Sequence, residues 1–169
     1  ESELTLQNSS GTSSKNDVSA SLFSFNLGYK PTGTRFLNSV FLGLDRVSGD
    51  DSSTETAEGF SKEFGARHKH HGFYDYTDHK KYFGHGHDGL NEINAKANID
   101  ILKRTNLLVA LHNFRSAVKD IYYGNEVNFI FKTKHNDEVS SEIGSVFYFP
   151  DQGNEKTLPF FYLMITADF

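Results

Sequence analysis

The sequence predicts an all-β protein, in which a small N-terminal β-sheet region, residues 1–66, precedes an antiparallel up-and-down β-barrel of eight strands, residues 67–169. Two observations support this prediction. Apolar and polar residues alternate with a period of two along several segments, and helical periodicity is hard to find. Short polar stretches, some marked by Pro or Gly, separate these segments. We expect the barrel to be closed, because closure removes exposed sheet edges.

Alternation is cleanest over residues 93–101, INAKANIDI. Ile and Ala side chains fall on one face of this segment, whereas Asn, Lys and Asp fall on the other, as a half-buried strand requires. One of the two faces must therefore be in contact with water. Strands are also predicted at 18–29, 34–45, 106–114, 125–134, 141–149 and 159–169.

The segments between these strands have turn composition. KPTG at 30–33 is typical of a hairpin connection, 135–140 of a polar turn, and 150–156 of a loop marked by Pro and Gly. Residues 47–66 are small and polar, so we place the boundary between the two regions there.

Composition excludes several classes of protein. The chain has 169 residues, a net charge of −5 and no Cys, so disulfides, thiolate metal ligands and a nucleic-acid footprint are not expected. No apolar run approaches the ~18 residues of a membrane-spanning helix. Its polar start is typical of a mature, exported chain. Catalytic motifs are absent from the sequence, and we predict that the protein is not an enzyme.

Histidines are concentrated in one segment, since six of the eight lie between positions 68 and 87. Imidazole binds haem iron, aromatic rings can cover a porphyrin, and a cation can meet a propionate. A solvated loop is the competing interpretation, and a buried core residue is the interpretation for His112. Candidate haem contacts are His68, His70, His71, His79, His85, His87, Tyr74, Tyr82, Phe83 and Arg67.

The same segment offers an alternative metal site. Imidazole suits zinc and copper, although the spacing matches no recognised zinc motif. The candidate ligands for such an ion are His70, His71, His85 and His87.

Four short motifs occur in the order known from one protein family. They are GFYDYTDHKK at 72–81, ANIDILKRTNLLVAL at 97–111, IYYGNEVNF at 121–129 and GSVFYFPDQGNE at 144–155. Together they resemble the barrel domain of the transferrin-binding protein B lipoprotein family. Among its relatives, the chain looks most like the secreted, haem-carrying hemophilins.

This resemblance implies a function. A hemophilin-like protein would be exported through the periplasm of a Gram-negative bacterium and cross the outer membrane with a surface lipoprotein assembly modulator. It would capture haem, with a host haemoprotein as a further partner, and deliver the haem to a TonB-dependent outer-membrane receptor. We therefore predict a secreted hemophore.

Two alternatives stay open. One is a module that binds a host protein through loops on the barrel rim. The other is an eight-stranded outer-membrane β-barrel, which the alternating apolar residues at 161–169 favour. Predicted strands of about 8 residues, residues 106–114 with apolar residues on both faces and the absence of Trp all count against the membrane.

Overall fold

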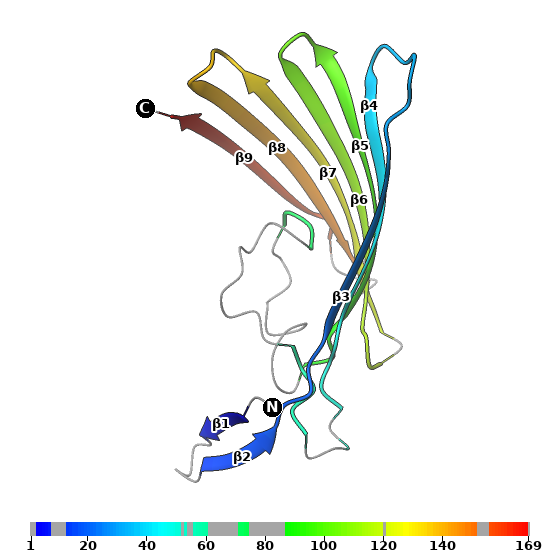
Figure 1. The fold of residues 1–169 in the computed structure, drawn as a ribbon, viewed down its shortest axis with the longest axis vertical. Coiled ribbons are helices and arrows are strands. Elements are labelled where there is room, and N and C mark those ends of the chain that lie inside the picture. Colours follow the sequence, from blue (N-terminus) through cyan, green and yellow to red (C-terminus); the bar gives the residue numbers. More distant parts are fainter. Residues whose placement is uncertain are drawn as a thin grey trace.

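The computed structural model is all-β and is dominated by one large antiparallel sheet (Figure 1). No helix among the described residues is long and apolar enough to cross a membrane. The structure describes residues 3–7, 13–51, 53, 56–60, 71–74, 87–119, 121–151 and 156–168, with side chains from residue 18 onward.

Nine strands make up the described fold. Short turns join neighbours such as β5 and β6, where Leu102 pairs with Thr105 across the turn. The strands are β1 (Glu3–Gln7), β2 (Ser13–Asp17), β3 (Leu22–Tyr29), β4 (Leu37–Val47), β5 (Leu90–Leu102), β6 (Thr105–Arg115), β7 (Tyr122–Lys134), β8 (Val139–Pro150) and β9 (Leu158–Ala167).

Seven strands, β3 to β9, follow one another in chain order across the large sheet, and each pairs antiparallel with the next. The predicted antiparallel, meandering arrangement is confirmed. The predicted closed, eight-stranded barrel is wrong for the described residues, because β3 and β9 do not pair with each other and the sheet stays open. In Figure 1 the sheet is curved and its strands fan apart towards one end.

The large sheet contains strands from both sides of the boundary placed between residues 66 and 67. β3 and β4 precede that boundary, yet β4 pairs with β5 over most of its length, from Leu37 with Ile99 to Val47 with Leu90. A separate two-stranded sheet is formed by β1 and β2 alone. Residues 72–74, expected to begin a barrel strand, lie outside any strand.

The two faces of the large sheet differ in chemistry. Directly paired residues share a face, so the register assigns each side chain to one side. The polar face carries Ser24, Asn26, Asp45, Glu92, Asn94, Lys96, Asn98, Asn106, His112, Glu126, Asn128, Lys132 and Glu142. The apolar face carries Phe25, Leu27, Leu42, Leu44, Ile93, Ala95, Ala97, Ile99, Leu107, Val109, Leu111, Val127, Phe129, Phe131, Ile143, Phe147, Phe149, Phe161, Leu163 and Ile165.

Burial follows the polar face. Glu92 is 1% exposed and its neighbour Ile93 is 59% exposed; Asn128 is fully buried and its neighbour Phe129 is 37% exposed. A water-soluble sheet shows the opposite arrangement, with the apolar face buried. The strand predicted along 93–101 lies within β5, with its apolar and polar residues on opposite faces. The faces differ in exposure at Ile93, which is exposed, and Asn94, which is buried, whereas residues 95–99 are half-buried on both faces.

A small apolar cluster also lies on the polar face, near the end where the strands converge. Val47, Leu90, Phe114 and Tyr148 are buried there and contact one another. Tyr74 packs against this cluster from outside the sheet, with its ring stacked on Tyr148 at 6.0 Å between centroids. Residues 71–74 therefore lie against the polar face.

Candidate functional site

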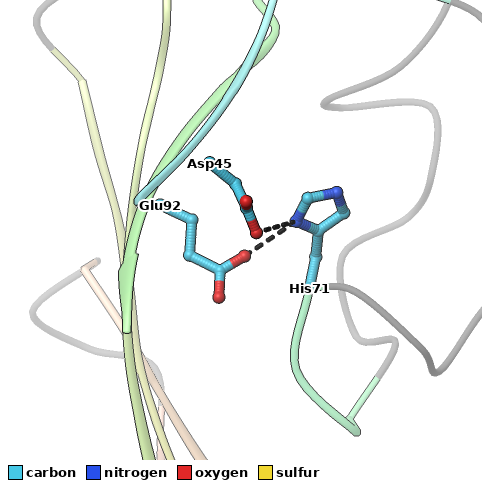
Figure 2. Close-up of side chains that lie close together, drawn as sticks. All are labelled: Asp45, His71 and Glu92. Atoms are coloured by element: carbon cyan, nitrogen blue, oxygen red, sulfur yellow. Dashed lines mark hydrogen bonds and ion pairs between the residues drawn. The ribbon is translucent and has the colours of Figure 1, made fainter. Parts of the chain in front are cut away.

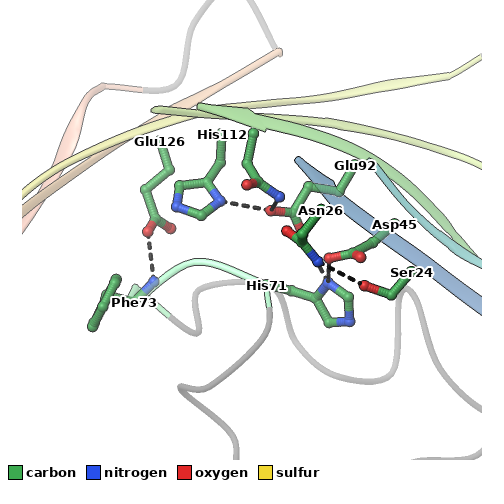
Figure 3. A network of polar contacts seen from close by, with 9 residues as sticks. Ser24, Asn26, Asp45, His71, Phe73, Glu92, His112 and Glu126 are labelled. Carbon is green, nitrogen blue, oxygen red and sulfur yellow. Dashed lines mark hydrogen bonds and ion pairs between the residues drawn. The ribbon is translucent and has the colours of Figure 1, made fainter. Parts of the chain in front are cut away.

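Residues 71–74 are held on the polar face by hydrogen bonds to side chains of the sheet (Figure 3). Glu126 of β7 accepts two of them, from the backbone N–H of Phe73 to Oε1 at 2.6 Å and from that of Tyr74 to Oε2 at 3.3 Å. One buried carboxylate thus satisfies two successive amides of a segment that has no strand partner.

Gly72 permits this close approach for two reasons. Its φ of 82° lies in the left-handed region that side chains disfavour. A Cβ at this position would also lie 2.6 Å from Glu126 Oε1. The backbone at residue 72 therefore comes close to the carboxylate only because no side chain intervenes.

His71 meets two carboxylates from neighbouring strands (Figure 2). Its Nδ1 lies 2.7 Å from Oε2 of Glu92 on β5 and 3.9 Å from Oδ2 of Asp45 on β4. Asp45 and Glu92 are directly paired across the two strands, so the register brings their side chains to one place. All three side chains are one-tenth exposed or less.

The second oxygen of Glu92 is held from the other side. Oε1 lies 2.6 Å from Nδ1 of His112 on β6 and accepts a hydrogen bond of 3.1 Å from the Asn94 amide. The His112 ring is stacked on Phe114 at 5.7 Å, which fixes its orientation. Glu92 is therefore oriented so that Oε2 faces His71 and Asp45 (Figure 3).

The two buried glutamates differ in their acidity. Burial by itself opposes ionisation of Glu92, but the hydrogen bonds and charges of His112 and His71 outweigh it and lower the pKa of Glu92 to about 2. Burial raises the pKa of Glu126, and the amides of Phe73 and Tyr74 offset that effect only in part. Glu92 is thus the stronger anion of the two.

Several buried polar atoms at this place have no hydrogen-bond partner among the described residues. They include Oδ1 of Asp45, Oδ1 of Asn94 and Nε2 of His112. An unsatisfied buried polar atom costs about 1–3 kcal/mol. Such atoms are rare in folded proteins, where a bound ion or an ordered water commonly satisfies them.

Three residues of this arrangement could hold a metal ion. Among the described residues, Asp45, His71 and Glu92 form the one group whose ligand atoms all lie within 4.8 Å of one another. Imidazole nitrogen and carboxylate oxygen are the donor set of many zinc sites. Alternatively, His71 and Glu92 could share a proton in place of a metal ion. Their hydrogen bond would then fasten residues 71–74 to the sheet.

The residues predicted from the sequence fall into three groups. His71 and Tyr74 lie on the polar face, and His71 belongs to the group that could hold a metal. His87 is described, and its backbone carbonyl accepts a hydrogen bond from Asp50, but the group does not include it. The others lie outside the described residues: Arg67, His68, His70, His79, Tyr82, Phe83 and His85.

His112 is buried, as the interpretation of it as a core histidine requires, but it also orients Glu92. Sequence reasoning missed Asp45, Glu92 and Glu126. A signal was present, because Glu92 continues the polar series of residues 94–100 by one step, and Glu126 and Asn128 alternate with the apolar Val127 and Phe129. The sequence did not reveal that β4 pairs with β5, and this pairing is what brings Asp45 next to Glu92.

Comparisons of the chain with protein-family models, with curated proteins and with solved structures find no match.

Proposed function

We propose that the large sheet is part of the wall of an outer-membrane β-barrel, with its apolar face against lipid and its polar face lining the interior. The observation that supports the proposal best is the exposure of the apolar face together with the burial of the polar face. A barrel in a bilayer has this polarity, because lipid replaces water outside and polar groups collect inside.

Exposed apolar side chains on this scale are costly in water. Burying one Leu, Ile or Phe side chain stabilises a protein by about 1.5–3 kcal/mol. The apolar face leaves many of them exposed, among them Leu44, Ile93, Leu111, Phe161 and Leu163. Lipid acyl chains of a bilayer would cover the whole face without requiring a matching protein surface.

The length of the strands fits a bilayer. β4 to β9 have 10 to 13 residues each. A tilted spanning strand needs ~9–11 residues. The sequence-based argument against the membrane was that several strands reach only about 8 residues. In the large sheet β3 has this length, and the other six strands are longer.

Polar, basic and aromatic residues border the apolar face at one end, as is expected of a surface that faces a membrane. At one end, Arg46, Asn91, Arg115 and Tyr122 occupy one row of paired residues on this face. The guanidinium of Arg115 lies 5.4 Å from the centre of the Tyr122 ring. Aromatic and basic residues of this kind are favoured where a bilayer meets water.

The open edges of the sheet require further strands if the sheet lies in a bilayer. Each edge strand, β3 or β9, has a described partner on one side only. A bilayer offers no hydrogen bonds to free backbone groups, so membrane sheets close on themselves. In the proposed function, further strands therefore pair with β3 and β9 and complete a barrel larger than seven strands. Its polar interior would give polar solutes a path or a binding site.

Lipid contact can be tested by fluorescence, because the chain contains no Trp. Phe160 and Phe161 are neighbours on β9 that face opposite sides of the sheet. We expect a Trp in F161W to be quenched by brominated lipid in reconstituted vesicles, and a Trp in F160W to be quenched much less. Equal quenching of the two variants, or no insertion into vesicles, would contradict the proposal.

Secreted haem capture stays a prediction, since most of the candidate ligands lie outside the described residues. His71 favours it in one respect, because a carboxylate on one ring nitrogen orients the imidazole for a metal at the other. A haemin titration followed at the Soret band tests it, with alanine at all six clustered histidines as the control.

A further inference from the structure

We propose that Asp45, His71 and Glu92 form a binding site for a divalent transition-metal ion, for which Zn²⁺ is the probe. The site does not depend on the proposed membrane location, since it rests on contacts within the polar face.

Charge is the first argument. Two carboxylates, Asp45 and Glu92, come together where both are at least nine-tenths buried. Their described ion-pair partners are histidines, and no Lys or Arg of the described residues pairs with either of them. The charges of His112 and His71 compensate Glu92, but the described ion-pair partner of Asp45 is His71 alone, at 3.9 Å. A buried carboxylate without a close compensating cation is costly. A divalent ion would supply that charge.

The unpartnered atoms are the second argument. A proton on His71 Nδ1 can serve Glu92 at 2.7 Å, but Asp45 at 3.9 Å is beyond hydrogen-bond distance. Oδ1 of Asp45 is buried without a partner, and so is Oδ1 of Asn94, whose amide group bonds to Glu92. The structure therefore concentrates more acceptors at this place than the described donors can satisfy.

Geometry is the third argument. Ligand atoms about 2.1 Å from a tetrahedral zinc lie about 3.4 Å from one another. The distances from His71 Nδ1, 2.7 Å to Glu92 and 3.9 Å to Asp45, lie on either side of that value. Small rotations of the three side chains would therefore suffice to place them around an ion. The ion would replace the proton on Nδ1, as metal binding to histidine requires.

The surrounding contacts resemble the support that metal ligands usually have. His112 and Asn94 both hold Oε1 of Glu92, which leaves Oε2 directed at His71. Partners of this kind orient a ligand and raise its affinity for the metal. With zinc bound, His71 and the segment that follows it would be tied to β4 and β5.

The test uses the purified full chain after EDTA treatment, titrated with Zn²⁺ in competition with a chromophoric chelator. We expect one zinc per chain, and binding at least ~100-fold weaker in D45N and in E92Q, each of which removes a ligand charge and keeps the shape. H135Q is the matched control, because His135 lies in a hairpin and bonds to Ser141. Wild-type affinity in D45N and E92Q would overturn the proposal.

Histidines elsewhere in the chain could also bind zinc, so a second measurement identifies the ligands. X-ray absorption of the zinc-loaded wild-type protein should show one imidazole, with oxygen as the other ligands. Two or more imidazoles per zinc would overturn the proposal even if D45N and E92Q fail to fold. Equally tight binding of Ca²⁺ would also overturn it, because calcium prefers oxygen ligands over imidazole.

Discussion

Glu92 joins three parts of the protein through one carboxylate. Its two oxygens contact His71 outside the sheet and His112 on β6, while Asn94 supports it along β5. Neither oxygen is left without a contact. Through its contact with His71, Glu92 fixes the position of residues 71–74 relative to the sheet. Glu126 does the same by accepting hydrogen bonds from the backbone amides of Phe73 and Tyr74.

Gly72 offers a test of that attachment, with Gly33 as a matched control. Both residues have a φ of 82°, but a Cβ at Gly33 would meet no atom within 4 Å, whereas one at Gly72 would meet the Glu126 carboxylate. We expect G33A to lower the free energy of unfolding by about 1 kcal/mol through backbone strain alone. G72A should cost more, by about 1–3 kcal/mol, because it also displaces Glu126.

Unfolding in denaturant gives the free energy of unfolding of both variants. Hydrogen exchange of the Phe73 and Tyr74 amides reports directly whether residues 71–74 are attached to Glu126. Faster exchange of these amides in G72A, but not in G33A, is the expected result. If the two variants behave alike, Glu126 does not hold the segment.

At the level of strands, a substitution by Lys is expected to destabilise the protein by different amounts on the two faces of β6. Leu111 is half exposed on the apolar face, and Asn106 lies on the polar face near the turn that begins the strand. If the apolar face contacts lipid, L111K should cost about 2–4 kcal/mol near the middle of the bilayer. N106K should cost much less, because a polar interior accommodates the charge.

Folding into lipid vesicles, followed by urea titration, gives the difference between L111K and N106K. In a water-soluble sheet the order would change, since a Lys at an exposed apolar position is harmless or favourable there. A stable L111K would therefore contradict the membrane assignment.

Two glycines on the strands show how the sheet accommodates its aromatic residues. The ring of Tyr162 on β9 lies over Gly144 on β8, and the ring of Phe41 on β4 lies over Gly28 on β3. An added Cβ would collide with the ring in both cases. Aromatic side chains placed over cross-strand glycines help to fix the register of neighbouring strands.

For the whole molecule, the open edges β3 and β9 lead to a prediction if the sheet belongs to a membrane barrel, as proposed. A closed barrel satisfies every backbone group and resists SDS until it is heated. We expect the protein to remain in the membrane pellet after alkaline carbonate washing, and to change its mobility in SDS gels on boiling. Release by carbonate, with no change on boiling, would contradict the proposed closure.

The sequence by itself determined the strands and the alternation of their side chains. The period of two is a local property of an extended backbone, so the positions of β4 to β9 could be predicted to within a few residues. The antiparallel order of β5 to β9 could also be predicted, because short connections join these strands. His71 was also among the predicted site residues, because the histidines are close together in the sequence.

Only the tertiary structure decided which face is buried and which residues meet. Alternation is the same whether a strand turns its apolar side to a protein core or to lipid, so exposure had to come from the packing of the whole sheet. Asp45 and Glu92 are far apart in the chain, and the register of β4 against β5 places them opposite each other. His71 joins them because residues 71–74 fold back onto the polar face, a long-range contact that no local pattern encodes.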